Sequence, residues 1–353
     1  MSLHTQTPSA HLVGSINLPD AETVFRTASE HLGAHLKRIP DGEVGERFYW
    51  IHFQKAHFDR TTGLSRVGEP GFFLRGHFDT RPFTLDAGVQ AADLVFPPLG
   101  YASAARESYQ TFARLRADGV IAPGTRFQVS LPTPAAVIGS FFVPEHKAAV
   151  EPIYERALFA ELDQILDDIP HGDLAIQWDT ALEFGLLEQA VVYGTTLTAW
   201  FDDVFGGVIE RALRQVAQVP ADVHLGFHLC YGDVEEEHFV QPKDAQLLAD
   251  VAQAILSRSP RNIDWVHLPV PIDRDDEAYF APLKAVDWPE STELYLGLVH
   301  HEDGIDGAAA RIAAARTAVG EFGVATECGF GRGPAERTAP LFDLHAQVVE
   351  RSL

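Results

Sequence analysis

The sequence has few of the residues on which several classes of protein depend. Among 353 residues there are only two cysteines, Cys230 and Cys328, and one methionine. A secreted protein built on disulfides would carry more cysteines, so we expect a cytoplasmic protein. No run reaches the roughly 18 consecutive apolar residues of a membrane-spanning helix, and residues 1–11 lack the basic and apolar parts of a signal peptide. We therefore expect no membrane partner.

Positive charge is also scarce. The chain has 27 lysines and arginines against 50 aspartates and glutamates, which gives a formal net charge of −23. This balance argues against nucleic acid and anionic membranes as partners, because neither can be neutralised by so acidic a chain. Hydrophobic residues make up 46% of the sequence, enough for a large core. None of these numbers decides the oligomeric state, which stays open.

Short apolar or alternating segments recur along the chain, each followed by a segment with helical periodicity. The predicted strands lie near residues 11–17, 36–40, 125–132, 174–179, 223–230, 262–270, 293–300 and 323–329. The predicted helices lie near residues 20–35, 102–118, 145–167, 199–217, 243–258, 275–285, 305–320 and 334–352. Eight strand–helix pairs in unbroken alternation predict an α/β fold, a single (β/α)8 TIM barrel in which residues 1–353 form one domain.

Residues 41–100 interrupt this alternation. The segment is rich in glycine, proline, phenylalanine and arginine, and it is longer than a loop between barrel strands needs to be. We interpret it as an insertion after the second strand, folded over the end of the barrel at which the strands terminate.

The alternation within the strands predicts which side chains point into the barrel. In 223–230, the apolar residues fall on one face, and His228 and Cys230 share the other face. The same division points Asp179 inward from 174–179 and His267 inward from 262–270. These polar groups converge on the carboxyl ends of the strands, where the active sites of TIM barrels lie.

His228 and Cys230 stand about 7 Å apart along one strand, close enough for their side chains to lean toward one ion. Cys328 ends the last predicted strand and would reach the same place across the barrel. Imidazole and thiolate are the ligands that zinc prefers, and three protein ligands would leave the open position of a catalytic site. The alternatives are a structural zinc, two cysteines that only fill the core, and a disulfide between them.

A resemblance to a known family rests on these residues. His228-Leu229-Cys230, followed later by Glu327-Cys328-Gly329-Phe330, resembles the catalytic C-terminal barrel of cobalamin-independent methionine synthase, a family of zinc-dependent thiol alkyltransferases. Weaker marks, within about residues 11–335, are Val13-Gly14-Ser15, Asp41-Gly42-Glu43, and Ile176-Gln177-Trp178-Asp179 with Glu183. The resemblance implies that these segments bind the substrate, through Ser15, Glu43, Asp179 and Glu183.

The chain also departs from the family. It has room for one barrel, whereas the full synthase carries two. The family has a glutamate zinc ligand on the sixth strand, but the matching stretch here is Val266-His267-Leu268, so His267 is the candidate replacement. The family's general acid is a histidine after the seventh strand, and His300 and His301 both stand there. Of the two, His301 is slightly favoured as the acid.

The resemblance implies a zinc cofactor and alkyl transfer, of a methyl group foremost, with a zinc-bound thiolate as the nucleophile. Its partners would be a small-molecule thiol and an alkyl donor, which is a folate, a corrinoid or an epoxide. Three rival interpretations stay open: a zinc hydrolase, a metal-free barrel lyase of the uroporphyrinogen-decarboxylase type, and a protein that only sequesters a thiol or a corrinoid. Turnover with any thiol acceptor would separate an enzyme from the last of these.

Overall fold

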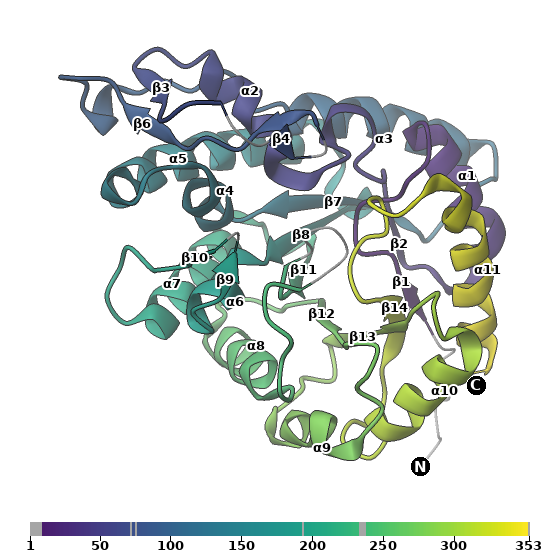
Figure 1. Cartoon of the computed structure of the whole chain (residues 1–353). Helices are drawn as coiled ribbons and strands as arrows, with labels where there is room; N and C mark the ends of the chain where they lie inside the picture. Colours follow the sequence, from purple (N-terminus) through teal and green to yellow (C-terminus); the bar gives the residue numbers. More distant parts are fainter. Residues whose placement is uncertain (1–8, 71–72, 75, 193, 233–237, 352–353) are drawn as a thin grey trace.

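The computed structural model describes residues 9–70, 73–74, 76–192, 194–232 and 238–351, and a parallel eight-stranded sheet forms its centre (Figure 1). In chain order the strands are β1 (Ala10–His11), β2 (Arg38–Pro40), β7 (Arg126–Pro132), β8 (Leu174–Thr180), β11 (His224–Leu229), β12 (Trp265–Pro269), β13 (Glu293–Val299) and β14 (Gly323–Thr326). Their hydrogen-bonded order is β1-β14-β13-β12-β11-β8-β7-β2, and a parallel bridge from Ala10 to Leu36 links the two ends. The predicted TIM barrel is confirmed.

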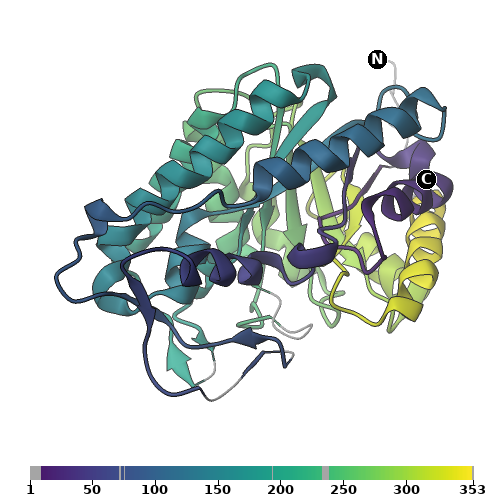
Figure 2. The same ribbon diagram turned by 90° about the horizontal axis from the view of Figure 1, so that it is seen from above.

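Helices surround this barrel (Figures 1 and 2). They are α1 (Ala21–Leu32), α3 (Tyr101–Ala117), α5 (Pro144–Asp168), α7 (Val204–Gln218), α8 (Gln246–Arg258), α9 (Glu277–Phe280), α10 (Gly304–Ala315) and α11 (Ala335–Arg351). Two further short helices, α4 (Pro134–Phe141) and α6 (Leu182–Leu187), follow β7 and β8. The Asp20 carboxylate caps α1 by accepting from the Thr23 amide at 2.8 Å. Within the described residues, no helix is both long and apolar enough to cross a bilayer.

The first and last strands end well before their predicted limits. The first was expected over 11–17 but ends at His11, and the last was expected over 323–329 but ends at Thr326. Beyond these points the chain leaves the barrel wall, and Ile16 forms a separate parallel bridge with Phe330. The Ile16 amide also donates to the Gly42 carbonyl at 2.9 Å. Apolar pattern alone cannot distinguish such bridged loops from barrel strands.

The barrel interior is filled near the amino ends of its strands. Ala175, Trp265 and Tyr295 form a buried cluster there, separate from the main core between strands and helices. The buried Arg38 guanidinium lies over the Trp265 ring, with its Cζ 4.0 Å from the ring centre. This plug leaves only the carboxyl ends of the strands open for a site.

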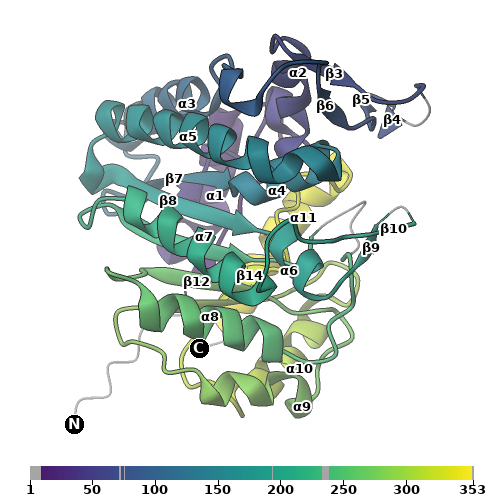
Figure 3. The same cartoon turned by 90° about the vertical axis from the view of Figure 1, so that its left-hand side faces the viewer.

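The segment after β2 folds into its own small elements. They are 3₁₀ turns at Gly45–Arg47, Trp50–Phe53 and Ala91–Asp93, the helix α2 (Gln54–Asp59), and the strands β3 (Leu64–Arg66), β4 (Phe73–Leu74), β5 (Phe78–Asp79) and β6 (Phe83–Leu85). The pairs β3–β6 and β4–β5 are antiparallel. The hairpins extend to the same side of the barrel as the hairpin of β9 (Val191–Val192) and β10 (Thr195–Thr196) (Figure 3). A bridge from Phe83 to Phe142 ties the segment to the chain between α4 and α5.

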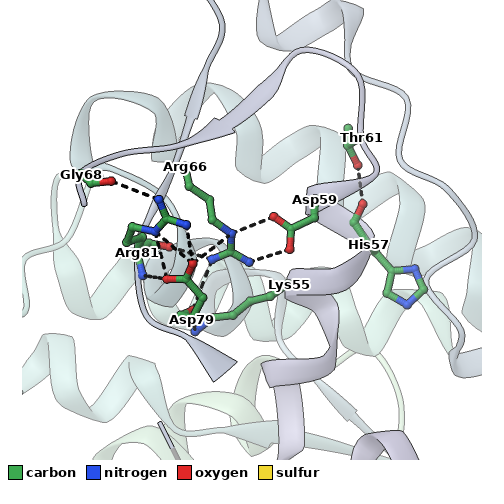
Figure 4. A network of polar contacts seen from close by, with 8 residues as sticks. All are labelled: Lys55, His57, Asp59, Thr61, Arg66, Gly68, Asp79 and Arg81. Carbon is green, nitrogen blue, oxygen red and sulfur yellow. Dashed lines mark hydrogen bonds and ion pairs between the residues drawn. The ribbon is translucent and has the colours of Figure 1, made fainter. Parts of the chain in front are cut away.

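A network of charges fastens α2 to these hairpins (Figure 4). Arg66 of β3 pairs with Asp59 at 2.7 Å and donates to the Asp79 and Arg81 carbonyls at 3.3 and 3.2 Å. Arg81 pairs with the Asp79 carboxylate at 2.6 Å, and Lys55 donates to the Asp79 carbonyl at 2.8 Å. Since these strands have only two or three residues, ion pairs and carbonyl contacts hold the hairpins to α2, in addition to the buried side chains of Phe58 and Phe83 in the main core.

Gly226 should be essential for packing the barrel interior. It pairs with Trp265 in register, and a Cβ at this position would lie 2.0 Å from Trp265 Cδ2. We expect Gly226→Ala to lower the free energy of unfolding by about 1–3 kcal/mol through overpacking, measured by thermal and chemical denaturation. Gly172→Ala is the control, because a Cβ added there would meet nothing within 4 Å beyond its own chain neighbours. Equal stability of the two variants would contradict the packing argument.

Candidate active site

Three predicted metal ligands meet where the barrel strands end. His228 is the fifth residue of β11, Cys230 follows that strand directly, and Cys328 lies two residues beyond β14. Their ligand atoms all lie within 4.8 Å of one another, and His228 Nε2 is 3.7 Å from Cys328 Sγ. In tetrahedral zinc sites, bonds of about 2.0 and 2.3 Å place such a nitrogen and sulfur about 3.5 Å apart. The residues therefore fit a zinc ion in both chemistry and spacing.

Hydrogen bonds from the adjoining strands hold the backbone of this cluster. The Thr180 hydroxyl at the end of β8 donates to the His228 carbonyl at 3.1 Å, and the Cys230 amide donates to the Thr180 carbonyl at 2.9 Å. On the other side, the Thr326 hydroxyl donates to the Cys328 carbonyl at 2.7 Å. Two threonines, each the last residue of its strand, thus position the backbone of the three residues of the cluster.

His267 lies next to this cluster and contacts His228. The two Nδ1 atoms are 2.7 Å apart, and His267 Nε2 is 3.1 Å from the Thr326 carbonyl oxygen. Both ring nitrogens of His267 therefore have partners within the protein. Burial lowers the pKa of His267 to about 3 and holds the pKa of His228 well below its usual value.

A cavity beside the cysteines contains two of the predicted substrate-binding carboxylates. We call it the carboxylate cavity; besides the three residues of the cluster, its walls include Ser15, Glu43, Trp50, Asp179 and Arg332. Burial raises the pKa of Glu43 to about 7, and burial followed by the Glu43 charge raises the pKa of Asp179 well above its usual range. Gln177 donates to Asp179 at 2.9 Å. A cationic group bound between these carboxylates would relieve their repulsion.

The loop after β2 holds Glu43 in an unusual conformation. Glu43 has a φ of 50°, and the preceding Gly42 has a φ of 81° in a place where a Cβ would lie 2.7 Å from Val24. The Asp41 carboxylate accepts from the Glu43 amide at 3.0 Å and pairs with Arg47 at 2.5 Å. The Asp41-Gly42-Glu43 motif thus builds a tight turn that directs one carboxylate into the cavity.

Ser15 and Gly329 bring the two ends of the chain together at the site. Ser15 is buried, and a Cβ on Gly329 would lie 2.4 Å from Ser15 Oγ. Only glycine allows the chain after Cys328 to pass so close to the loop that follows β1. This close approach places Ser15 in the wall of the carboxylate cavity.

Glu183, the fourth predicted substrate-binding residue, does not line the carboxylate cavity. It is buried in α6. Burial raises its pKa from 4.5 to about 7, opposed by a hydrogen bond to Thr133 and by the charge of Arg211. The structure therefore brings Ser15, Glu43 and Asp179 together but not Glu183.

His300 and His301 line a second cavity, which we call the histidine cavity. His300 is buried, and its Nε2 donates to the Val270 carbonyl at 2.8 Å while its Nδ1 is 4.0 Å from Glu327. Burial lowers the pKa of His300 to about 4. The His301 side chain is 33% exposed, with its Nδ1 3.0 Å from Glu302.

The two cavities meet at the cysteine side of the cluster. Both are lined by Gly232, Cys328, Gly329 and Arg332. A species in the carboxylate cavity and a second one in the histidine cavity would therefore face each other across Cys328.

Sequence reasoning missed several residues around the cluster. His238 Nε2 is 3.2 Å from Glu327 Oε1, so Glu327 stands between His238 and His300 in the histidine cavity. Glu327 adjoins Cys328 in the recognised motif, which was a usable signal. Trp50 carried none, because it reaches the carboxylate cavity from a 3₁₀ turn, outside any regular pattern.

Comparisons of sequence identify no relative: no protein-family model matches the chain, and no curated protein matches it. Comparisons of structure find solved proteins of similar fold. A B12-independent methionine synthase from Shewanella sp. W3-18-1, in complex with selenomethionine, superposes with a TM-score of 0.60 at 14% identity and covers 98% of this chain and 97% of its own. The two chains share a fold.

Two other solved structures agree with this likeness. A putative vitamin-B12-independent methionine synthase from Listeria monocytogenes has a TM-score of 0.56 at 16% identity, over 98% of this chain and 99% of that one. A methyltransferase from Methanosarcina mazei has a TM-score of 0.57 at 12% identity, over 99% of this chain and 94% of that one. At such low identity, these neighbours establish the fold of the chain, which is the fold expected from the sequence.

The cluster should bind zinc in the purified protein. We expect close to stoichiometric zinc in protein prepared without added metal, and loss of that zinc in both Cys230→Ser and Cys328→Ser, because each removes one thiolate. Elemental analysis measures the content. His224→Gln is the control, since His224 lies at the other end of the same strand and the variant should keep its zinc. Absence of zinc after reconstitution of the unmodified protein would contradict the assignment.

Glu183 should make stability depend on pH. Its pKa is raised in the folded chain, so ionisation favours the unfolded chain as pH rises from about 4.5 to about 7. Glu183→Gln removes this effect. We expect the variant to gain on the order of 1–3 kcal/mol over the unmodified protein at pH 8 and little at pH 4.5, measured by denaturant unfolding. The exposed Glu290→Gln is the control, and a gain that does not change with pH would contradict the argument.

Proposed function

We propose that this chain is a zinc-dependent transferase that moves an alkyl group, a methyl group foremost, to a small-molecule thiol. One observation carries the proposal: a His-Cys-Cys cluster with the spacing of zinc ligands lies where two differently lined cavities meet. The names of the structural neighbours, methionine synthase and methyltransferase, agree with this chemistry.

His228, Cys230 and Cys328 would hold the zinc ion. When bound, zinc supplies the Lewis acidity that keeps a substrate thiol in its nucleophilic, deprotonated form near neutral pH. Two thiolates and one neutral imidazole balance the charge of Zn²⁺, and three protein ligands leave a position for the substrate. Sulfur-rich ligation disfavours a hydrolase, because thiolate donors reduce the Lewis acidity that activation of water requires.

The carboxylate cavity would bind the thiol acceptor. Glu43 and Asp179 present two buried carboxylates that a substrate ammonium group would neutralise, and Arg332 brings a positive charge to the same wall. An amino-acid thiol such as homocysteine carries both complementary charges. Charge-assisted hydrogen bonds to the ammonium group would orient the sulfur toward Cys230 and Cys328.

The histidine cavity would receive the alkyl donor. The acceptor sulfur would attack the alkyl carbon, and the bond from that carbon to its leaving group would break with the electron pair going to the leaving group. His301 would then supply the proton that the leaving group needs, because its ring is part-exposed and can be reprotonated from water. His300, fixed by the Val270 carbonyl, would line the pocket as a neutral ring.

The activity test pairs zinc-loaded protein with thiols and with donors of the three classes: methyl-folate, methyl-corrinoid and epoxide. We expect a thioether product, detected by mass spectrometry, from at least one pair, and its loss in Cys328→Ser. Failure of every pair with protein of verified zinc content would overturn the proposed function.

Asp179 should discriminate between thiols by their amino group. We expect Asp179→Asn to reduce kcat/KM for homocysteine by about 10- to 100-fold, since a charge-assisted hydrogen bond is worth about 1.5–3 kcal/mol. The matched substrate is 4-mercaptobutyrate, which lacks the amino group and should lose much less. Steady-state kinetics with both thiols measure the difference. An equal loss for the two would show that Asp179 does not bind the ammonium group.

A further inference from the structure

Two imidazole rings meet at the buried side of the proposed metal centre. His228 on β11 and His267 on β12 pair in register, and their ring centres are 4.7 Å apart. The Nδ1 atoms are 2.7 Å apart, which is a hydrogen-bond distance. One of these two nitrogens must carry the proton and the other must accept it.

The partner of His267 on its other side decides which nitrogen is the donor. His267 Nε2 is 3.1 Å from the Thr326 carbonyl oxygen, and a carbonyl can only accept. His267 Nε2 therefore carries a proton. In a neutral ring its Nδ1 is then an acceptor, so His228 Nδ1 must donate. This leaves the lone pair on His228 Nε2, the nitrogen 3.7 Å from Cys328 Sγ.

The surroundings keep these rings neutral. His267 is fully buried and His228 is 3% exposed. The ring of His11 lies 5.8 Å from the His267 ring, and the hydrogen bonds of the pair within the described residues join the two rings to each other, to a carbonyl and to a thiol. A buried imidazolium here would have no carboxylate among these hydrogen-bond partners to stabilise its charge.

We infer that His267 is a positioning residue that holds His228 in the tautomer whose Nε2 can bind a metal. The inference rests on the proposed zinc centre. It gives His267 a different role from that of a ligand, because both of its nitrogens are already bonded within the protein.

The arrangement connects the two sides of the site. Thr326 accepts from His267 through its carbonyl and donates through its hydroxyl to the carbonyl of Cys328. The same residue at the end of β14 thus orients the imidazole of His228 through His267 and the thiol of Cys328 through the backbone. A hydrogen-bonded path runs from Cys328 to His228 without passing through the metal.

Two substitutions separate the hydrogen bond from packing. His267→Phe fills the space but cannot accept from His228, whereas His267→Asn places an amide oxygen close to the position of Nδ1. His345→Phe is the matched control, because His345 is also buried and also donates from Nε2 to a β14 carbonyl, that of Val324 at 3.0 Å. It has no hydrogen bond to His228 in the described structure.

The first measurement is the zinc dissociation constant by chelator competition. We expect His267→Phe to weaken zinc binding by about 10- to 100-fold, the usual effect of losing a partner of a ligating histidine. His267→Asn should recover most of this loss, and His345→Phe should bind like the unmodified protein. Wild-type affinity in His267→Phe, or an equal loss in His267→Asn or His345→Phe, would overturn the inference.

The second measurement observes the tautomer itself and needs no variant of His267 to fold well. In metal-free protein labelled with ¹⁵N-histidine, the ring shifts of His228, assigned with His228→Gln, should be those of an Nδ1–H tautomer. Nε2–H shifts would overturn the inference. Because this readout requires neither zinc nor turnover, it decides the role of His267 even if the proposed function fails.

Discussion

The site depends on the register of three neighbouring barrel strands. Parallel pairing sets His228 of β11 beside Asp179 of β8 on one side and beside His267 of β12 on the other. A slip of one residue would turn each of these side chains from the interior to the outer face. His228, Asp179 and His267, the residues proposed to bind the metal, to bind an ammonium group and to orient His228, are thus one layer of the barrel. The plug of Trp265 and Tyr295 beneath it supports that layer.

The same layer carries a cost in stability. Glu43 and Asp179 lose their hydration without an ion pair strong enough to restore ordinary acidity, so their pKa values rise. Glu43 also has a left-handed backbone conformation that non-glycine residues rarely adopt. Backbone strain and desolvated carboxyl groups collected at one end of the barrel are what a site shaped for a charged ligand would show. The binding of an ammonium group would recover part of that free energy.

Local pattern was enough to predict most of this architecture. The eight strands and the inward direction of Asp179, His228 and His267 followed from alternation, because a side chain's face is set by position along a strand. The limits of the first and last strands did not follow, since Ile16 and Phe330 bridge each other outside the barrel wall. Apolar residues in a bridged loop and in a strand have the same composition.

The same distinction separates the residues of the candidate site that could be predicted from those that could not. Residues whose position depends on strand parity lie on the face predicted from alternation. Hydrogen bonds between side chains could not be predicted from the sequence. Glu183 matched a motif, yet it lies in α6 and is not among the residues lining the carboxylate cavity, because one helical turn after β8 carries the chain away from the interior. The contacts of His267 with Thr326, and of His238 with Glu327, join residues about sixty and ninety positions apart. No local signal indicates such pairs.

The division of the site into two cavities constrains the directions from which two reactants could approach each other. Cys328 and Gly329 form part of both walls, so groups in the two cavities approach the cluster from different sides. A displacement at carbon requires the incoming sulfur and the leaving group to lie on opposite sides of that carbon. Gly329 has no side chain to obstruct that line, and a Cβ there would collide with Ser15. The glycine after Cys328 is therefore required by the fold and would also leave the proposed reaction path open, which explains why a cysteine followed by glycine suits this position.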